Sequence, residues 1–236
     1  MPPERADETT SSDTALRDYY AARADEYDDW YLRRGRYSHG PDADAAWTAE
    51  LAGAAAWIGS LPLHGSIVEL AAGTGWWSPL LARRGELTIY DANPAPLAIA
   101  RDRLAGAGLT AVVEVRDAWA WPDRAVDGLF MGFWLSHVPR ARLGEFLAIC
   151  RAWLKPGGTL AFIDSRLDPE SSATDHPTPS DDLSRRRLND GREFTITKIF
   201  WTPAEMETAL TAAGFTEASV EQTPRFFLMG RATAAI

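Results

Sequence analysis

Residues 66–77 combine a short apolar run with a turn made of small residues, and an acidic residue lies within the run. The run that starts at Ile67 favours a strand, and a helical pattern begins near Trp77. Small side chains let the backbone approach a ligand closely, and the first amides of a helix point toward it. Glu69 precedes the turn, and Asp91 follows the next strand, where a carboxylate is placed for ribose hydroxyls. The pattern predicts a site for a nucleoside-containing cofactor.

The composition excludes several classes of function. The chain has 236 residues, of which 46% are hydrophobic and 24% charged, as in an ordinary globular protein. Its net charge of −9 argues against a general affinity for nucleic acid. Cys150 is the single cysteine and cannot form an internal disulfide, and no apolar run resembles a signal peptide or a membrane span. We predict a soluble cytoplasmic protein, a monomer or homodimer, that acts on a small molecule without nucleic acid, membrane or metal.

From residue 66 onwards, predicted strands and helices alternate, which is typical of a doubly wound parallel sheet in an α/β fold. We predict strands over 66–71, 87–91, 110–115, 127–133, 158–164, 192–201, 216–222 and 225–231, and helices over 76–84, 94–106, 140–153 and 203–213. Residues 155–158 read as a sharp turn between a helix and a strand, because proline cannot continue the helix. The last two strands can form an antiparallel edge.

The N-terminal part of the chain predicts a helical cap. Helices are expected over 15–27 and 42–58, and the first carries Tyr19, Tyr20 and Tyr27 as an aromatic face that either packs in the core or covers the cofactor. Residues 171–182 are rich in serine, proline and aspartate and predict a mobile loop or lid. We see no repeat or linker. We therefore predict a disordered tail over 1–13 and one domain over 14–236, divided into cap helices (14–60) and a core (61–236).

Two cofactor classes compete for this architecture. A dinucleotide site requires G-x-G-x-x-G, but the turn at 71–76 reads Ala-Ala-Gly-Thr-Gly-Trp and lacks the third glycine. This disfavours a nicotinamide-dependent oxidoreductase. With Glu69 before the turn, Asp91 after the second strand, Asp117 after the third and the turn at 155–158, the chain resembles the class I S-adenosylmethionine-dependent methyltransferases over nearly its whole length.

This resemblance implies a Rossmann-like, mostly parallel seven-stranded sheet and S-adenosyl-L-methionine as the cofactor. Asp91 would accept the ribose hydroxyls, and Asp117 would hold the adenine amino group. The other residues expected to contact the cofactor are Tyr19, Tyr27, Glu69, Ala71, Gly73, Gly75, Trp76, Ala92, Ala118, Trp119 and Phe133. A related scaffold that keeps the cofactor without transferring its methyl group is a competing possibility.

Three further features concern the methyl acceptor. His137 follows the fourth predicted strand, at the edge where open α/β sheets bind ligands, and it is either structural or active. Period-two alternation places Lys198 on an apolar strand face, although the opposite face is apolar too and the side chain could instead extend past the strand end. The basic run at 185–187 either pairs with acids on a solvated helix face or binds an anion.

These features resemble a narrower group, the phosphonate O-methyltransferases of the dehydrophos antibiotic pathway. The likeness rests on the segments at 19–28, 134–139 and 190–198. It implies that Arg186 and Lys198 bind the acceptor oxyanion, that His137 is the active-site histidine, and that Tyr31 or Tyr37 lines the pocket. We therefore predict methylation of an oxygen of a small phosphonate-type intermediate, with His137 orienting the acceptor. The alternative is O- or N-methylation of an alcohol, phenol, carboxylate or amine, with His137 as general base.

Overall fold

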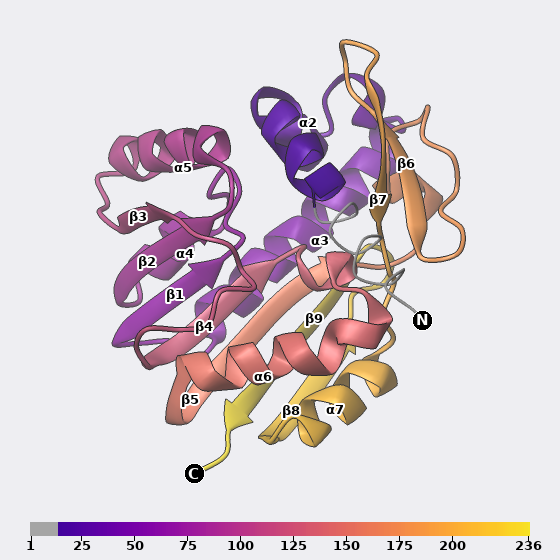
Figure 1. Cartoon of the computed structure of the whole chain (residues 1–236). Coiled ribbons are helices and arrows are strands. Elements are labelled where there is room, and N and C mark those ends of the chain that lie inside the picture. Colours follow the sequence, from indigo (N-terminus) through magenta and orange to yellow (C-terminus); the bar gives the residue numbers. More distant parts are fainter. Residues whose placement is uncertain (1–13) are drawn as a thin grey trace, which may run out of the picture.

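A seven-stranded sheet organises the computed structural model, which describes residues 14–236 (Figure 1). The strands are β1 (Ser66–Leu70), β2 (Glu86–Asp91), β3 (Val112–Val115), β4 (Val126–Gly132), β5 (Leu154–Ser165), β8 (Phe215–Gln222) and β9 (Phe227–Ala234). Their order is β3-β2-β1-β4-β5-β9-β8. The first five are parallel, and β9 runs antiparallel to both β5 and β8. The mostly parallel sheet and its antiparallel edge confirm the sequence prediction, whereas the predicted tail over 1–13 lies outside the described residues.

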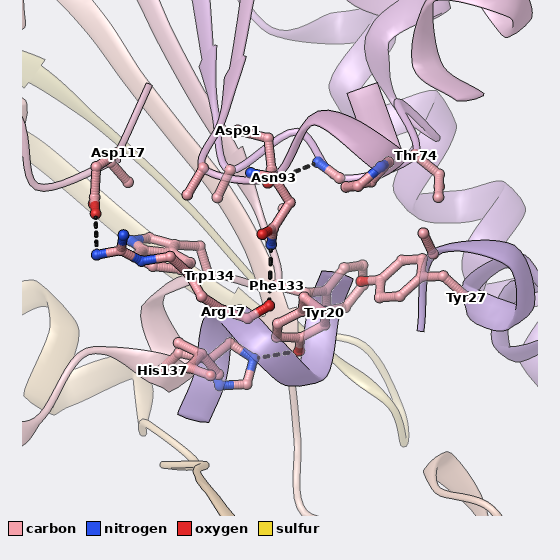
Figure 2. A pocket seen from close by; sticks show the side chains of 18 of the residues that line it. Arg17, Tyr20, Tyr27, Thr74, Asp91, Asn93, Asp117, Phe133, Trp134 and His137 are labelled. Atoms are coloured by element: carbon pink, nitrogen blue, oxygen red, sulfur yellow. Dashed lines mark hydrogen bonds and ion pairs between the residues drawn. The ribbon is translucent and has the colours of Figure 1, made fainter. Parts of the chain in front are cut away.

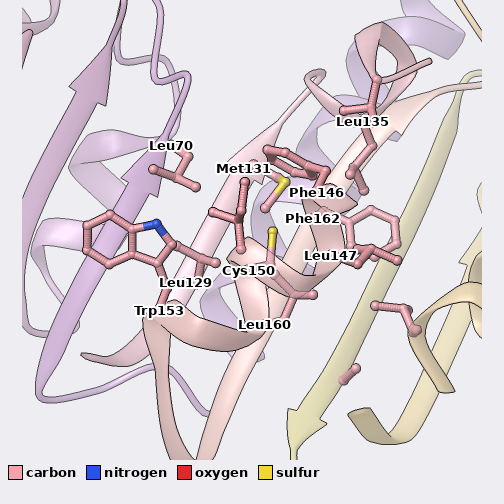
Figure 3. Close-up of a cluster of buried hydrophobic side chains, with 14 of the residues drawn as sticks. Leu70, Leu129, Met131, Leu135, Phe146, Leu147, Cys150, Trp153, Leu160 and Phe162 are labelled. Atoms are coloured by element: carbon pink, nitrogen blue, oxygen red, sulfur yellow. The ribbon is translucent and has the colours of Figure 1, made fainter. Parts of the chain in front are cut away.

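Helices cover both faces of the sheet because the side chains of its central strands alternate between two cores. Val68 and Leu70 of β1 join the core beneath α6 (Leu143–Trp153) and α7 (Pro203–Ala212), which Figure 3 shows in part. Ile67 faces the opposite core, formed with α3 (Pro41–Ser60), α4 (Ser78–Ala82) and α5 (Pro94–Gly106). Strands buried on both faces read as continuous apolar runs, as β1 and β4 do.

The N-terminal segment lies over the carboxyl ends of the parallel strands (Figure 1). It consists of a helix over residues 14–22, the 3-10 turn η1 (Ala24–Glu26), the short helix α2 (Tyr27–Tyr31) and the 3-10 turn η2 (Gly35–Tyr37). The predicted continuous helix over 15–27 is therefore wrong, since the α-helix ends before Arg23. Among residues 14–236, no helix has both the length and the apolarity that a membrane span requires.

A second, two-stranded sheet lies beside the N-terminal segment and corrects two predictions. It pairs β6 (Leu183–Arg187) with β7 (Glu193–Thr197) in antiparallel register. The basic run is thus part of a strand and not of a helix, and the strand predicted over 192–201 ends at Thr197. The turn between the strands contains Asp190 and Gly191, and Gly191 adopts a φ of 91°. Aspartate followed by glycine is a common hairpin turn, because both residues tolerate a positive φ.

The remaining differences concern element boundaries. The helix predicted over 76–84 is shorter at both ends and consists of α4. The helix predicted over 140–153 begins with the 3-10 turn η4 (Arg140–Arg142). The turn predicted at 155–158 lies within β5. Val126 of β4 pairs with Leu154 of β5, and Gly128 pairs with Thr159. More residues of β5 than of β4 lie between these two pairs, so β5 forms a bulge there. A bulge absorbs extra residues without ending a strand. The 3-10 turns η3 (Leu135–His137) and η5 (Pro169–Ser171) follow β4 and β5 and approach the site described next.

Candidate active site

A cavity opens where β1, β2 and β4 end, beside the point at which the strand order reverses (Figure 2). Open α/β sheets bind ligands at this position because the loops diverge there to opposite faces. Its lining residues are Leu16, Arg17, Tyr20, Ala24, Tyr27, Ala71, Gly73, Thr74, Asp91, Ala92, Asn93, Pro96, Asp117, Ala118, Trp119, Gly132, Phe133, Trp134 and His137.

Asp91 links the two turns that form the floor of this cavity. One carboxylate oxygen accepts a hydrogen bond from the Gly73 amide at 2.9 Å, and the other accepts one from the Asn93 amide at 2.8 Å. Burial raises the pKa of the Asp91 carboxyl to about 6. The carboxylate thus holds the backbone of both turns in place while it lines the cavity.

Asp117 joins the loop after β3 to the N-terminal helix. Its carboxylate accepts from the Trp119 amide at 2.9 Å and pairs with Arg17 at 3.0 Å. The Arg17 carbonyl in turn accepts a hydrogen bond from the Asn93 side chain at 3.3 Å (Figure 2). The helix over 14–22 is therefore held across the cavity by contacts with the loops after β2 and β3.

Four residues predicted to contact the cofactor lie outside this lining. Glu69 is buried and accepts a hydrogen bond from the Ser78 hydroxyl at 2.5 Å, and burial raises its pKa to about 8. Gly75 has a φ of 69°, and a Cβ placed there would lie 2.7 Å from Ala100, so its glycine allows α5 to pack against the turn. The rings of Trp76 and of Tyr31, a predicted acceptor ligand, stack 4.1 Å apart. Tyr19 packs with Leu188 and Ile196.

A second cavity adjoins the first and shares Tyr20, Tyr27, Phe133 and His137 with it. Its other lining residues are Arg23, Trp30, Tyr37, Ser165, Ser171, Ser172, His176, Arg186, Lys198 and Phe200. The predicted residues His137, Arg186, Lys198 and Tyr37 are thus brought together, whereas Tyr31 is not among them. Among the described residues, the lining contains arginine, lysine and histidine but neither aspartate nor glutamate, which favours an anionic ligand.

His137 lies between the two cavities in a defined tautomer. Its Nδ1 lies 2.6 Å from the Thr197 carbonyl, which can only accept, so Nδ1 carries the proton. Its Nε2 therefore accepts a hydrogen bond from the Tyr20 hydroxyl at 2.7 Å (Figure 2). Burial, together with the nearby Lys198 ammonium, holds the pKa of His137 well below its usual value. The imidazole is neutral at physiological pH.

Lys198 reaches the second cavity from the residue that follows β7. Its ammonium lies 2.8 Å from the Ser136 hydroxyl, 3.2 Å from the Ser165 hydroxyl and 3.5 Å from an Asp164 carboxylate oxygen. Only 7% of the residue is exposed, and burial lowers the pKa of the amine to about 8. The charge thus has the partner that the sequence analysis required, supplied by the end of β5.

Strand alternation selects one arginine from the basic run. Arg186 points toward the second cavity, with Nη1 3.2 Å from the Ser172 hydroxyl and 3.0 Å from His176 Nδ1. Arg185 faces the other way and pairs with the exposed Glu193 of β7. The alternative for this run was ion pairing with the nearby Asp181 and Asp182. Among residues 14–236, none of the three arginines pairs with either of them, and Asp182 pairs with Arg140.

Several lining residues were not among those predicted from the sequence. Tyr20 was noted only as part of an aromatic face, and the structure places it, and not Tyr19, on the wall between the cavities. Arg23, Ser172 and His176 also line the second cavity. Helical phase could have separated Tyr20 from Tyr19. The composition of residues 171–182 predicted a loop or lid, but it did not indicate that Ser172 and His176 line the second cavity.

Comparison with known proteins decides the family. Residues 67–158 match a family described as a methyltransferase domain. The structure of DhpI in complex with SAM and HEP superposes with a TM-score of 0.73 at 31% identity, and covers 94% of this chain and 97% of that chain. The DhpI–SAH complex gives a TM-score of 0.69 at 32% identity, with 94% and 96% covered. The chain belongs to the class I S-adenosylmethionine-dependent methyltransferases.

Shorter matches link the methyltransferase to quinone biosynthesis enzymes. The ubiquinone/menaquinone biosynthesis C-methyltransferase UbiE of Chromobacterium violaceum is 32% identical over 106 residues, which is 42% of this chain and 42% of that protein. UbiE of Bordetella avium is 35% identical over 107 residues, 42% of this chain and 40% of that protein. The chain therefore spans about two fifths of the length of these relatives.

The residues of the first cavity fit S-adenosylmethionine, the cofactor of this methyltransferase. The lining of the cavity includes two carboxylates, Asp91 and Asp117, and the small residues Ala71 and Gly73. Acidic side chains suit ribose hydroxyls and an amino group, and small residues allow a close backbone approach. When bound, S-adenosylmethionine supplies an electrophilic methyl group. The individual contacts of these residues with the cofactor stay predictions.

Proposed function

We propose that this methyltransferase transfers a methyl group to an oxygen of a small phosphonate-type anion in natural-product biosynthesis. The observation that supports the proposal is the basic second cavity, which shares a wall with the cofactor cavity and whose lining residues within 14–236 include no acid. Arg186 and Lys198 hold two oxygens of the acceptor, and the third oxygen faces the shared wall. Arginine and lysine are the side chains that bind phosphoryl-type groups best.

The chemistry requires alignment more than acid–base catalysis. Orienting two reactants well can lower a barrier by about 7–11 kcal/mol. A phosphonate oxygen is already anionic at neutral pH and needs no base. His137 is neutral, and the Tyr20 hydroxyl occupies its free ring nitrogen. We therefore assign His137 an orienting role, in which it holds Tyr20 at the wall between the two cavities.

The extent of the likenesses supports an oxygen acceptor over the carbon acceptor of UbiE. The matches to DhpI, one of them a complex with SAM and HEP, cover 94% of the chain. The UbiE match covers 106 residues. Residues of the second cavity extend from Tyr20 to Phe200, farther apart than that match can include. The resemblance to UbiE therefore carries little information about the acceptor.

A second candidate function has one observation in its favour. The Nε2 lone pair of His137 points to the wall between the cavities, where it could act as a base toward an alcohol, phenol or amine if Tyr20 moved. A carboxylate acceptor would need no base and would use the same cations. These acceptors define the alternative to a phosphonate.

A screen of acceptor classes tests the proposal. The purified protein is incubated with S-adenosylmethionine and an alkylphosphonate, an aliphatic carboxylate, a phenol or an amine, and products are analysed by mass spectrometry for one added methyl group. We expect a phosphonate monoester from the first reaction and little product from the others. Methylation of the phenol or amine without the phosphonate would favour the second candidate function.

Replacement of His137 by alanine separates the two roles of this residue. With a phosphonate acceptor we expect kcat to fall only about tenfold, because Tyr20 loses its partner but no proton transfer is lost; a general base typically contributes 100-fold or more. Initial rates of the wild type, His137→Ala and Lys198→Ala provide the measurement. If His137→Ala were inactive while Lys198→Ala kept full activity, both assignments would be wrong: the orienting role of His137 and the acceptor-binding role of Lys198.

Lys198 gives acceptor binding a dependence on pH. Burial lowers the pKa of its amine from 10.5 to about 8, and only the protonated form attracts an anion. We expect kcat/KM for the acceptor to fall as the pH rises through about 8. In Lys198→Arg, whose guanidinium stays charged, the fall should move to higher pH. Since the unfolded chain binds more protons between the two pKa values, the contribution of Lys198 to stability rises with pH in that window.

A further inference from the structure

Arg23 lies in the wall of the second cavity with an incomplete set of partners. It follows the N-terminal helix, and 7% of its surface is exposed. Its Nη2 donates a hydrogen bond to the Tyr37 hydroxyl at 3.1 Å, and its guanidinium lies 4.6 Å from the centre of the Tyr27 ring. Its Nε is buried and has no hydrogen-bond partner within residues 14–236. Most buried polar groups are satisfied, so the unpaired nitrogen requires an explanation.

The charges around the cavity point to an anion as the missing partner. Lys198 has Asp164 as a counter-ion. Arg186 contacts only the neutral groups of Ser172 and His176, and among residues 14–236 no carboxylate forms an ion pair with Arg186 or Arg23. The buried Arg23 and the half-buried Arg186 therefore share one cavity without a carboxylate partner among residues 14–236. Burying unpaired charges is costly, and aromatic contacts recover only part of that cost. A bound anion would offset the remaining cost of burying these charges.

The position of Arg23 connects the two cavities. Leu16, Arg17 and Tyr20 of the N-terminal helix line the cofactor cavity, and Arg17 pairs with Asp117 across it. Arg23 is the residue directly after this helix, and it lines only the second cavity. An anion bound by Arg23 would therefore hold the same segment that covers the cofactor.

We propose that Arg23 is a third ligand of the acceptor anion and that, through Arg23, acceptor and cofactor strengthen each other's binding. The inference rests on the proposed function, since it takes the acceptor to be a phosphonate-type anion. Its consequence is reciprocal: an anion in the second cavity increases the affinity for the cofactor, and the cofactor increases the affinity for the anion by the same factor. A side chain that only packed against the tyrosines would produce no such coupling.

The test compares Arg23→Met and Arg23→Lys with the wild type. Titration calorimetry measures the affinity for S-adenosylhomocysteine without and with saturating ethylphosphonate. We expect ethylphosphonate to tighten binding about tenfold in the wild type and not in Arg23→Met, as typical coupling energies imply. We further expect kcat/KM for ethylphosphonate to fall about 100-fold in Arg23→Met, mainly through KM, because one partner of a buried charge pair is lost. Arg23→Lys should retain part of both effects.

Arg34→Met is the matched control, because Arg34 is on the same segment but its side chain is 66% exposed and pairs with Asp29 outside the cavity lining. It should leave both measurements unchanged. If Arg23→Met binds S-adenosylhomocysteine alone as tightly as the wild type does, the variant is folded. If its affinity is lower, the comparison is made with Arg23→Lys instead. Normal coupling and KM in the Arg23 variants, while the wild type methylates phosphonates, would overturn the role of Arg23 alone. A wild type that methylates no phosphonate would overturn the proposed function, and this inference with it.

Discussion

Replacement of Lys198 by methionine is expected to lower kcat/KM for an anionic acceptor by about 1,000-fold, equivalent to roughly 4 kcal/mol. Methionine fills a similar volume but offers no charge to the acceptor. The substitution also removes the counter-ion of Asp164, of which 1% is exposed. Leaving one partner of a buried pair uncompensated typically destabilises a fold by about 3–5 kcal/mol. Urea unfolding and steady-state kinetics measure the two effects.

A double variant separates stability from acceptor binding. In Lys198→Met with Asp164→Asn, the buried carboxylate is replaced by a neutral amide. The backbone amides of Ser136 and Ser165 donate to different oxygens of Asp164, and the single amide oxygen of asparagine can accept from only one of them. We expect part of the lost stability to return while kcat/KM stays low. Recovery of activity in the double variant would contradict a direct role of Lys198 in acceptor binding.

Replacement of Asp91 by alanine is expected to weaken the binding of S-adenosylhomocysteine by about 1,000-fold. Hydrogen bonds to a charged group contribute about 1.5–3 kcal/mol each, and two ribose hydroxyls would lose them. The amides of Gly73 and Asn93 would lose their acceptor as well, so the turns that line the cavity would loosen. Titration calorimetry gives the affinity directly.

The exposed Asp102 of α5 provides the control for this experiment, since Asp102→Ala removes one negative charge without touching the cavity. Its affinity for S-adenosylhomocysteine should equal that of the wild type. In the wild type, the affinity should fall as the pH drops through about 6, the raised pKa of the Asp91 carboxyl. Tight binding by Asp91→Ala would place the ribose elsewhere.

The sequence by itself determined the central sheet and the position of the cofactor cavity. The apolar runs of β1 and β4 are buried on both faces, and such runs predict parallel strands without reference to the rest of the chain. The predicted end of each strand determines where the next loop begins. Because the strands are parallel, these loops lie at the same edge of the sheet. Asp91 and Asp117 therefore could be placed in one cavity from local patterns alone.

Only the tertiary structure decided which side chains form the second cavity. Tyr20 and His137 are 117 positions apart and meet because the N-terminal helix lies across the sheet edge. The position of Arg186 depends on a hairpin, and the charge of Lys198 on Asp164, which is 34 positions away on β5. Local propensity sets the elements, but it does not set how a cap, a hairpin and a loop pack over a sheet. That packing depends on contacts between distant parts of the chain, and these contacts created the basic site.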